Sequence, residues 1–160
     1  MSFYDERNQL RIDLNDELLN FDFLVNVEEG DASWFLHGCC YVFAAVLKLF
    51  NPSYTICYLM DNENPVIHVW CRDIEGNFID IRGKTSDIKD FFDEFEDWYD
   101  YQFPNEDAKI LEFESQDDYL SFIKEKLKID FSDSEWVSNR DISERLYHSY
   151  KEYYEEVRDK

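Results

Sequence analysis

The fold of this chain is decided by the segment GCCYVFAAVL, residues Gly38 to Leu47. Wound as a helix, this segment is apolar on nearly every side, and a helix that is apolar all round is buried all round. Asn51-Pro52 would stop it, so we expect a helix that begins at Ser33 or His37 and runs to about Leu49. The sequence therefore predicts a central buried helix.

Strand patterns follow this helix. Apolar, β-branched and alternating stretches lie at Thr55–Met60, Val66–Ile74, Asn77–Arg82 and, further along, Lys109–Phe113. The turn signal Glu75-Gly76-Asn77 should join the second and third strands as an antiparallel hairpin, and we expect Gly83 to end the third strand.

Further helices are predicted before, between and after the strand segments of the sequence. They cover Phe3–Asn20, Ser86–Tyr101, Ser115–Lys128 and Arg140–Val157. The third begins with Ser115-Gln-Asp-Asp118, which resembles a capping box. We expect an α+β fold in one domain, residues 1–160. An antiparallel sheet of about three to five strands would pack on the buried helix, flanked by the other helices.

Charge narrows the classes of partner. The chain of 160 residues has 37 Asp and Glu against 16 Lys and Arg, a net charge of −21. Solubility alone needs a net charge of only about 2–8 in a small domain. An excess of this size repels phosphate, so we expect no direct contact with nucleic acid or with a membrane. It favours a basic protein partner, although acidity that only keeps the chain soluble is the alternative.

The predicted helix Ser86–Tyr101 is the most acidic segment. Its outer face would carry Asp87, Asp90, Asp93, Glu94, Asp97 and Asp100. Successive turns separate such carboxylates by about 5.4 Å, a spacing comparable to that of charge along nucleic acid. We expect this face to bind a basic, nucleic-acid-handling protein; an ordinary solvated helix face is the alternative.

Three polar residues stand out inside apolar elements. Cys40 lies in the first turn of the buried helix, His68 within a strand, and Asp80 within the next strand. A thiol at a helix N-terminus is favoured as thiolate, a neighbouring histidine can accept its proton, and an aspartate can orient the histidine. A hairpin centred at residue 74 would place His68 beside Asp80. We predict a catalytic triad of Cys40, His68 and Asp80.

These residues also carry a resemblance to known proteins. Gly38-Cys-Cys40-Tyr-Val-Phe43-Ala44, then His68-Val69, then Gly76-Asn-Phe78-Ile-Asp80-Ile-Arg-Gly83 resemble a papain-like or transglutaminase-like cysteine domain over about residues 34–83. The resemblance implies that Cys40 is the nucleophile, His68 the base and Asp80 the orienting acid. Such a triad needs no cofactor.

A zinc site uses the same residues. His37 and Cys40 are spaced i, i+3, and with His68 and Asp80 they would give four ligands of the types that zinc accepts. Bound zinc would hold the thiolate and remove its nucleophilicity. The triad and the zinc site predict the same cluster, so both stay open. We expect Cys39 and Cys57 to be core residues, and Cys71 to face the side of its strand opposite to His68.

Two functions follow from these patterns. The first is an acidic inhibitor, encoded by a phage or mobile element, that binds a basic nucleic-acid-handling partner such as a CRISPR effector nuclease. Its papain-like cluster would be idle or bound to metal, and its composition resembles that of acidic inhibitors of the anti-CRISPR type. The alternative is an active cysteine hydrolase, deamidase or acyltransferase. The N-terminus has no signal-peptide pattern, so we expect a cytoplasmic protein with reduced cysteines.

Overall fold

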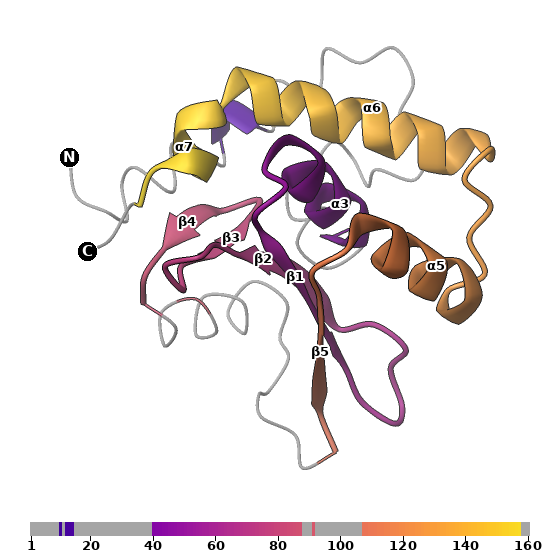
Figure 1. Cartoon of the computed structure of the whole chain (residues 1–160). Helices are drawn as coiled ribbons and strands as arrows, with labels where there is room; N and C mark the ends of the chain where they lie inside the picture. The colour runs from indigo at the N-terminus through magenta and orange to yellow at the C-terminus, as the bar shows by residue number, and fades with distance from the viewer. Residues whose placement is uncertain (1–9, 11, 15–39, 88–90, 92–106, 158–160) are drawn as a thin grey trace.

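The structure is a computed structural model that describes residues 10, 12–14, 40–87, 91 and 107–157 (Figure 1). Its elements, in chain order, are α3 (Cys40–Phe50), β1 (Thr55–Met60), β2 (His68–Arg72), β3 (Phe78–Asp80), β4 (Gly83–Thr85), β5 (Lys109–Phe113), α5 (Gln116–Lys126), α6 (Ser134–Ser149) and α7 (Lys151–Glu155). Most of the predicted helices Phe3–Asn20 and Ser86–Tyr101 lies outside the described residues, as does the start of the buried helix before Cys40.

The strands form one antiparallel sheet in the order β4-β3-β2-β1-β5. The predicted α+β class with an antiparallel sheet is therefore confirmed. Strands β1 and β5 have the bounds that the sequence predicted, and β1 pairs with both β2 and β5. The turn at Gly76, which has a φ of 87°, joins β2 to β3 as expected.

Helix α3 is the centre of the core, as predicted. It packs against β2 on one face of the sheet, with α6 and α5 beside it (Figure 1). Near its end, the buried Lys48 ammonium donates hydrogen bonds of 2.7 Å to the carbonyl oxygens of Pro52 and Tyr54. Burial of each large apolar side chain stabilises the fold by roughly 1.5–3 kcal/mol. Because most side chains of α3 are buried and apolar, this helix holds the sheet and the other helices together.

The other helices cover α3. In α5, the Tyr119 hydroxyl donates to the carbonyl oxygen of Tyr41 at 2.8 Å, which ties α5 to the first turn of α3. The predicted N-cap of α5 is confirmed, because the Ser115 side chain accepts the backbone N–H of Asp118. Among the residues that the structure describes, no helix is both long enough and apolar enough to cross a membrane.

Several predicted boundaries are wrong. Strands β2 and β3 are shorter than the predicted Val66–Ile74 and Asn77–Arg82. Gly83 begins β4 instead of ending a strand, because its φ of 110° permits a tight reversal that pairs it with Asp80. The helix predicted at Arg140–Val157 starts earlier and is divided into α6 and α7. Asp133 caps the start of α6 by accepting the backbone N–H of Glu135, and Tyr150 leaves helical geometry at the break.

Candidate functional site

The candidate site lies where β2 begins and β3 ends. These strands pair at Cys71 with Ile79 and at Arg72 with Phe78, so their register is centred at residue 75. The predicted centre at residue 74 was therefore one residue off. Continued along the strands, the observed register places His68 diagonally across from Asp80, and diagonal side chains on one face remain within reach.

His68 and Asp80 meet in the buried interior. Nε2 of His68 lies 2.9 Å from Oδ2 of Asp80, and the two residues are 0% and 2% exposed. Because an ionised carboxylate only accepts, Nε2 must carry the proton, and Nδ1 carries the lone pair in the neutral ring. In this tautomer Nδ1 is the nitrogen that can accept a proton. The predicted contact between His68 and Asp80 is confirmed.

Aromatic rings fix the plane of the imidazole. The centroid of the His68 ring lies 5.6 Å from that of Trp70, with 24° between the planes, and 5.9 Å from that of Phe91. Trp70 and Phe91 also contact each other. Such packing leaves little rotational freedom to the imidazole, so Nδ1 keeps one direction.

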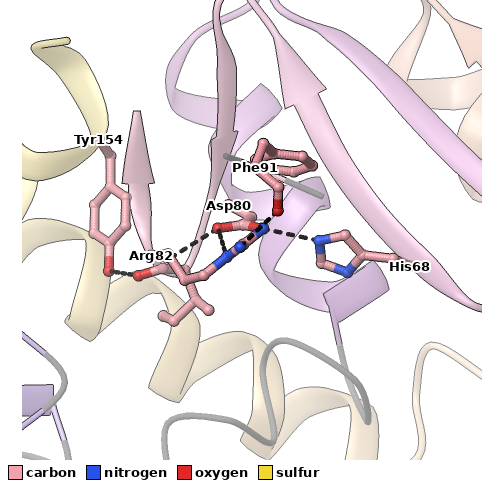
Figure 2. A network of polar contacts seen from close by, with 6 residues as sticks. His68, Asp80, Arg82, Phe91 and Tyr154 are labelled. Atoms are coloured by element: carbon pink, nitrogen blue, oxygen red, sulfur yellow. Dashed lines mark hydrogen bonds and ion pairs between the residues drawn. The ribbon is translucent and has the colours of Figure 1, made fainter. Parts of the chain in front are cut away.

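Arg82 is the member of the site that sequence reasoning missed. Its guanidinium lies against Asp80, with Nη2 at 2.7 Å from Oδ2, and its own backbone N–H donates to Oδ1 at 2.8 Å (Figure 2). Burial alone would raise the pKa of the Asp80 carboxyl, but the Arg82 charge and the His68 hydrogen bond hold that pKa well below its usual range. A signal was present, since the predicted strand Asn77–Arg82 places Asp80 and Arg82 on one face, although in the structure Arg82 lies in the reversal between β3 and β4.

Cys40 begins α3 and its thiol lies beside β2. The residue is 2% exposed. Burial raises the pKa of the thiol to about 12, while a hydrogen bond at the backbone of Val69 acts in the opposite direction and the charge of Asp80 adds to the rise. Burial therefore outweighs the helix N-terminal effect that we expected to favour the thiolate. Val69 follows His68 directly, but successive strand residues face opposite sides of a sheet, and Cys71, whose thiol bonds to α3, lies on the face opposite to His68. Among the described residues no hydrogen bond joins the Cys40 thiol to the His68 imidazole, so the structure brings His68 and Asp80 together but not Cys40 with them.

The other described cysteines lie in the sheet, where Cys57 of β1 pairs with Trp70 of β2. Burial raises the pKa of the Cys57 thiol to about 12. Cys71 donates a hydrogen bond of 3.4 Å from its thiol to the carbonyl oxygen of Ala44 in α3. Cys40, Cys57 and Cys71 are all free thiols. The burial of Cys57 agrees with the prediction that it is a core residue, and Cys71 faces α3.

The zinc alternative gains no support from the described residues. Within the described ranges, no three His, Cys, Asp or Glu side chains are grouped so that they could hold a metal ion. His37, the fourth predicted ligand, lies outside those ranges, as does Cys39.

The predicted partner-binding face is largely outside the structure as well. The residues of this face that the structure does not describe are Asp90, Asp93, Glu94, Asp97 and Asp100. Asp87 is exposed, and its backbone N–H donates to the Thr85 hydroxyl at 3.1 Å. Its carbonyl oxygen accepts the backbone N–H of Phe91 at 3.0 Å. That bond has the i to i+4 spacing of a helical turn.

Comparisons with known proteins add nothing to this geometry. No family model matches the chain, and neither a curated protein nor a solved structure is significantly similar to it. What the site can do therefore has to follow from its own residues.

Proposed function

We propose that this protein is a cysteine-dependent enzyme of the papain-like or transglutaminase-like kind, which hydrolyses or transfers an acyl group. The observation that carries the proposal is the buried hydrogen bond of 2.9 Å between His68 and Asp80. A buried carboxylate is costly unless it has partners, and thiol catalysis uses a histidine–carboxylate pair to take the proton of a cysteine. The proposal requires that the Cys40 thiol, at the start of α3, approach His68 when substrate binds.

The proposed reaction begins with proton transfer from the Cys40 thiol to Nδ1 of His68. The sulfur then attacks the substrate carbonyl carbon, and an oxyanion forms. As the oxyanion collapses, the carbon–nitrogen bond breaks and the leaving amine or ammonia takes the proton from His68, which leaves a thioester on Cys40. Asp80 keeps its bond to Nε2 throughout and stabilises the imidazolium.

The second half of the reaction sets the type of enzyme. Water or an amine gives a proton to His68 and attacks the thioester carbon, and the sulfur leaves and regains that proton. Water as the acceptor gives a hydrolase or a deamidase, and an amine as the acceptor gives an acyltransferase. All three share the same first step, so one test of Cys40 addresses them together.

Cys57 provides a matched control for that test. Cys40 and Cys57 are 2% and 1% exposed, and burial raises the pKa of each thiol to about 12. They differ in position: Cys40 is the first residue of α3 and the proposed nucleophile, whereas Cys57 lies within β1. Excess reactivity of Cys40 over Cys57 that is lost in His68→Gln would therefore report the imidazole and not a difference in burial.

The experiment is alkylation by chloroacetamide at neutral pH, followed by peptide mass spectrometry, in a Cys39→Ala background that removes the adjacent thiol. We expect Cys40 to be labelled much faster than Cys57, and His68→Gln to remove the difference without changing the rate at Cys57. Equal, slow labelling of Cys40 and Cys57 in the parent protein would contradict an enzymatic role.

The net charge favours a second function. We propose that the acidic surface binds a basic, nucleic-acid-handling protein, such as a CRISPR effector nuclease, as an inhibitor encoded by a phage or mobile element would. The support is a net charge of −21, severalfold larger than the value of about 2–8 that solubility needs. The cysteine cluster would then be a scaffold feature, idle or bound to metal.

Salt and charge removal test this second function. Affinity for the basic partner should fall steeply between 50 and 300 mM salt, because exposed charges are screened over roughly 10 Å at about 0.1 M. It should also fall when four acids of the predicted face are neutralised together, namely Asp90, Asp93, Glu94 and Asp97. The matched control neutralises four exposed acids elsewhere, namely Glu114, Asp117, Glu125 and Glu152. Equal effects of the two sets would reject a dedicated acidic face.

A further inference from the structure

The guanidinium of Arg82 contacts both carboxylate oxygens of Asp80. Its Nε lies 3.1 Å from both Oδ1 and Oδ2, and its Nη2 lies 2.7 Å from Oδ2. The two side chains are 1% and 3% exposed. Two donors in a rigid planar fork fix both the position and the plane of a carboxylate, which a single point charge does not do.

The other end of the guanidinium is also anchored. Nη1 of Arg82 donates to the carbonyl oxygen of Phe91 at 2.8 Å, and the guanidinium carbon lies 4.5 Å from the centroid of the Phe91 ring. Figure 2 shows Arg82 extended between Asp80 and Phe91, with His68 on the opposite side of the carboxylate. Arg82 is therefore held from both sides, and Asp80 lies between it and the imidazole.

The backbone after Arg82 is fixed as well. The Tyr154 hydroxyl of α7 donates to the carbonyl oxygen of Ile81 at 3.1 Å, and Gly83 pairs with Asp80 across the β3–β4 reversal (Figure 2). The segment that carries Asp80 and Arg82 is thus tied to α7. A buried arginine with this many contacts has little conformational freedom, so it needs no rearrangement when a substrate binds.

Two roles of Arg82 can be separated by their consequences. A residue that only balances buried charge would affect stability alone. A residue that orients Asp80 would also affect which nitrogen of His68 carries the proton, because Nε2–H is favoured only while Oδ2 faces it. Arg82 contacts both carboxylate oxygens of Asp80, and it shares Oδ2 with His68. These contacts favour the second role, in which Arg82 orients Asp80.

We propose that Arg82 is a positioning residue of the site: it fixes the Asp80 carboxylate so that His68 is held as the Nε2–H tautomer with Nδ1 as the base. The kinetic consequence of this role rests on the proposed cysteine chemistry, but the tautomer itself does not. Partners that orient a functional histidine typically change function by about 10- to 100-fold when they are removed.

The test is the tautomer of His68 in the full-length protein, read from long-range ¹H–¹⁵N spectra and assigned by comparison with His68→Gln. In the parent protein we expect one tautomer, with Nε2 protonated. Arg82→Gln should give a mixture and slow the alkylation of Cys40 about tenfold or more. Arg72→Gln is the control, because Arg72 lies on the same sheet in an exposed ion pair with Glu112. It should change neither measurement.

Arg82→Lys keeps the proposal falsifiable if Arg82→Gln does not fold. Lysine keeps the charge and loses the fork, so a mixture of tautomers in this variant supports positioning, and an unchanged single tautomer overturns it. A folded Arg82→Gln variant with the parent tautomer and labelling rate would overturn it equally. If Cys40 in the parent protein is no more reactive than Cys57, the proposed enzyme fails, whereas the tautomer still decides the role of Arg82.

Discussion

Replacing Asp80 with asparagine should destabilise the protein far more than its small change in shape suggests. The substitution leaves the Arg82 guanidinium, 1% exposed, without the carboxylate that balances it. It also aims an amide at groups that are themselves donors. Removing one partner of a buried ion pair costs about 3–5 kcal/mol, a large share of the roughly 5–15 kcal/mol that stabilises a typical domain.

Urea unfolding followed by tryptophan fluorescence measures this loss. Trp70 lies 5.6 Å from the His68 ring, so the emission reports on the site as well as on the fold. We expect Asp80→Asn to lower the free energy of unfolding by about 3–5 kcal/mol with an unchanged m-value, and the double variant with Arg82→Gln to lose less than the two single variants combined.

The control is an exposed pair of the same chemical type. Arg140 and Asp141 are 43% and 54% exposed in their side chains and lie 3.4 Å apart. Asp141→Asn should change the free energy of unfolding by no more than about 0.5 kcal/mol, because exposed pairs are solvated and screened. A loss below about 1 kcal/mol for Asp80→Asn would refute the view that Asp80 and Arg82 form a buried charged unit.

The remaining predictions concern pH, backbone geometry and a helix cap. Because the folded-state pKa of Asp80 is lowered, its stabilising contribution is complete above the ordinary carboxyl pKa of about 3.9 and is lost as pH falls toward the folded value. The stability gap between the parent and Asp80→Asn should therefore narrow below pH 4, as urea titrations would show. Gly83→Ala should lower the melting temperature more than Gly76→Ala: both have positive φ, but a Cβ at Gly83 would lie 3.1 Å from a backbone oxygen of α7, whereas nothing lies within 4 Å at Gly76. Ser115→Ala should cost about 1 kcal/mol in chemical denaturation, because it removes the side chain that caps α5; a neutral result would mean that the cap is not used.

Local patterns predicted the sheet well. Thr55–Met60 and Lys109–Phe113 have a clear apolar or β-branched character and turn residues at their ends, and the structure keeps their bounds. The prediction at Gly83 was wrong because glycine is common both at strand ends and in tight reversals. Only the pairing of Gly83 with Asp80 distinguishes these two cases. The start of α6 was missed because the cap, Asp133, lies in a polar stretch without strong apolar periodicity.

The candidate site was predicted in part. His68 and Asp80 could be found because each is a polar residue inside an apolar strand, and the hairpin brings such positions together. Their diagonal placement could not be predicted, because register depends on the detailed geometry of the turn. The thiol of Cys40 was expected to be acidic, but its pKa depends on how completely the tertiary fold buries it, which no local pattern records.

The most direct test of the central claim is whether Cys40, His68 and Asp80 act as one unit. The measurement is the alkylation rate of Cys40 in the parent protein, in His68→Gln, in Asp80→Asn and in the double variant, each relative to Cys57 in the same sample. Residues that act as a unit are strongly non-additive, so we predict that the double variant reacts no more slowly than His68→Gln alone. Rates that do not respond to His68, or losses from the two substitutions that simply multiply, would contradict the account.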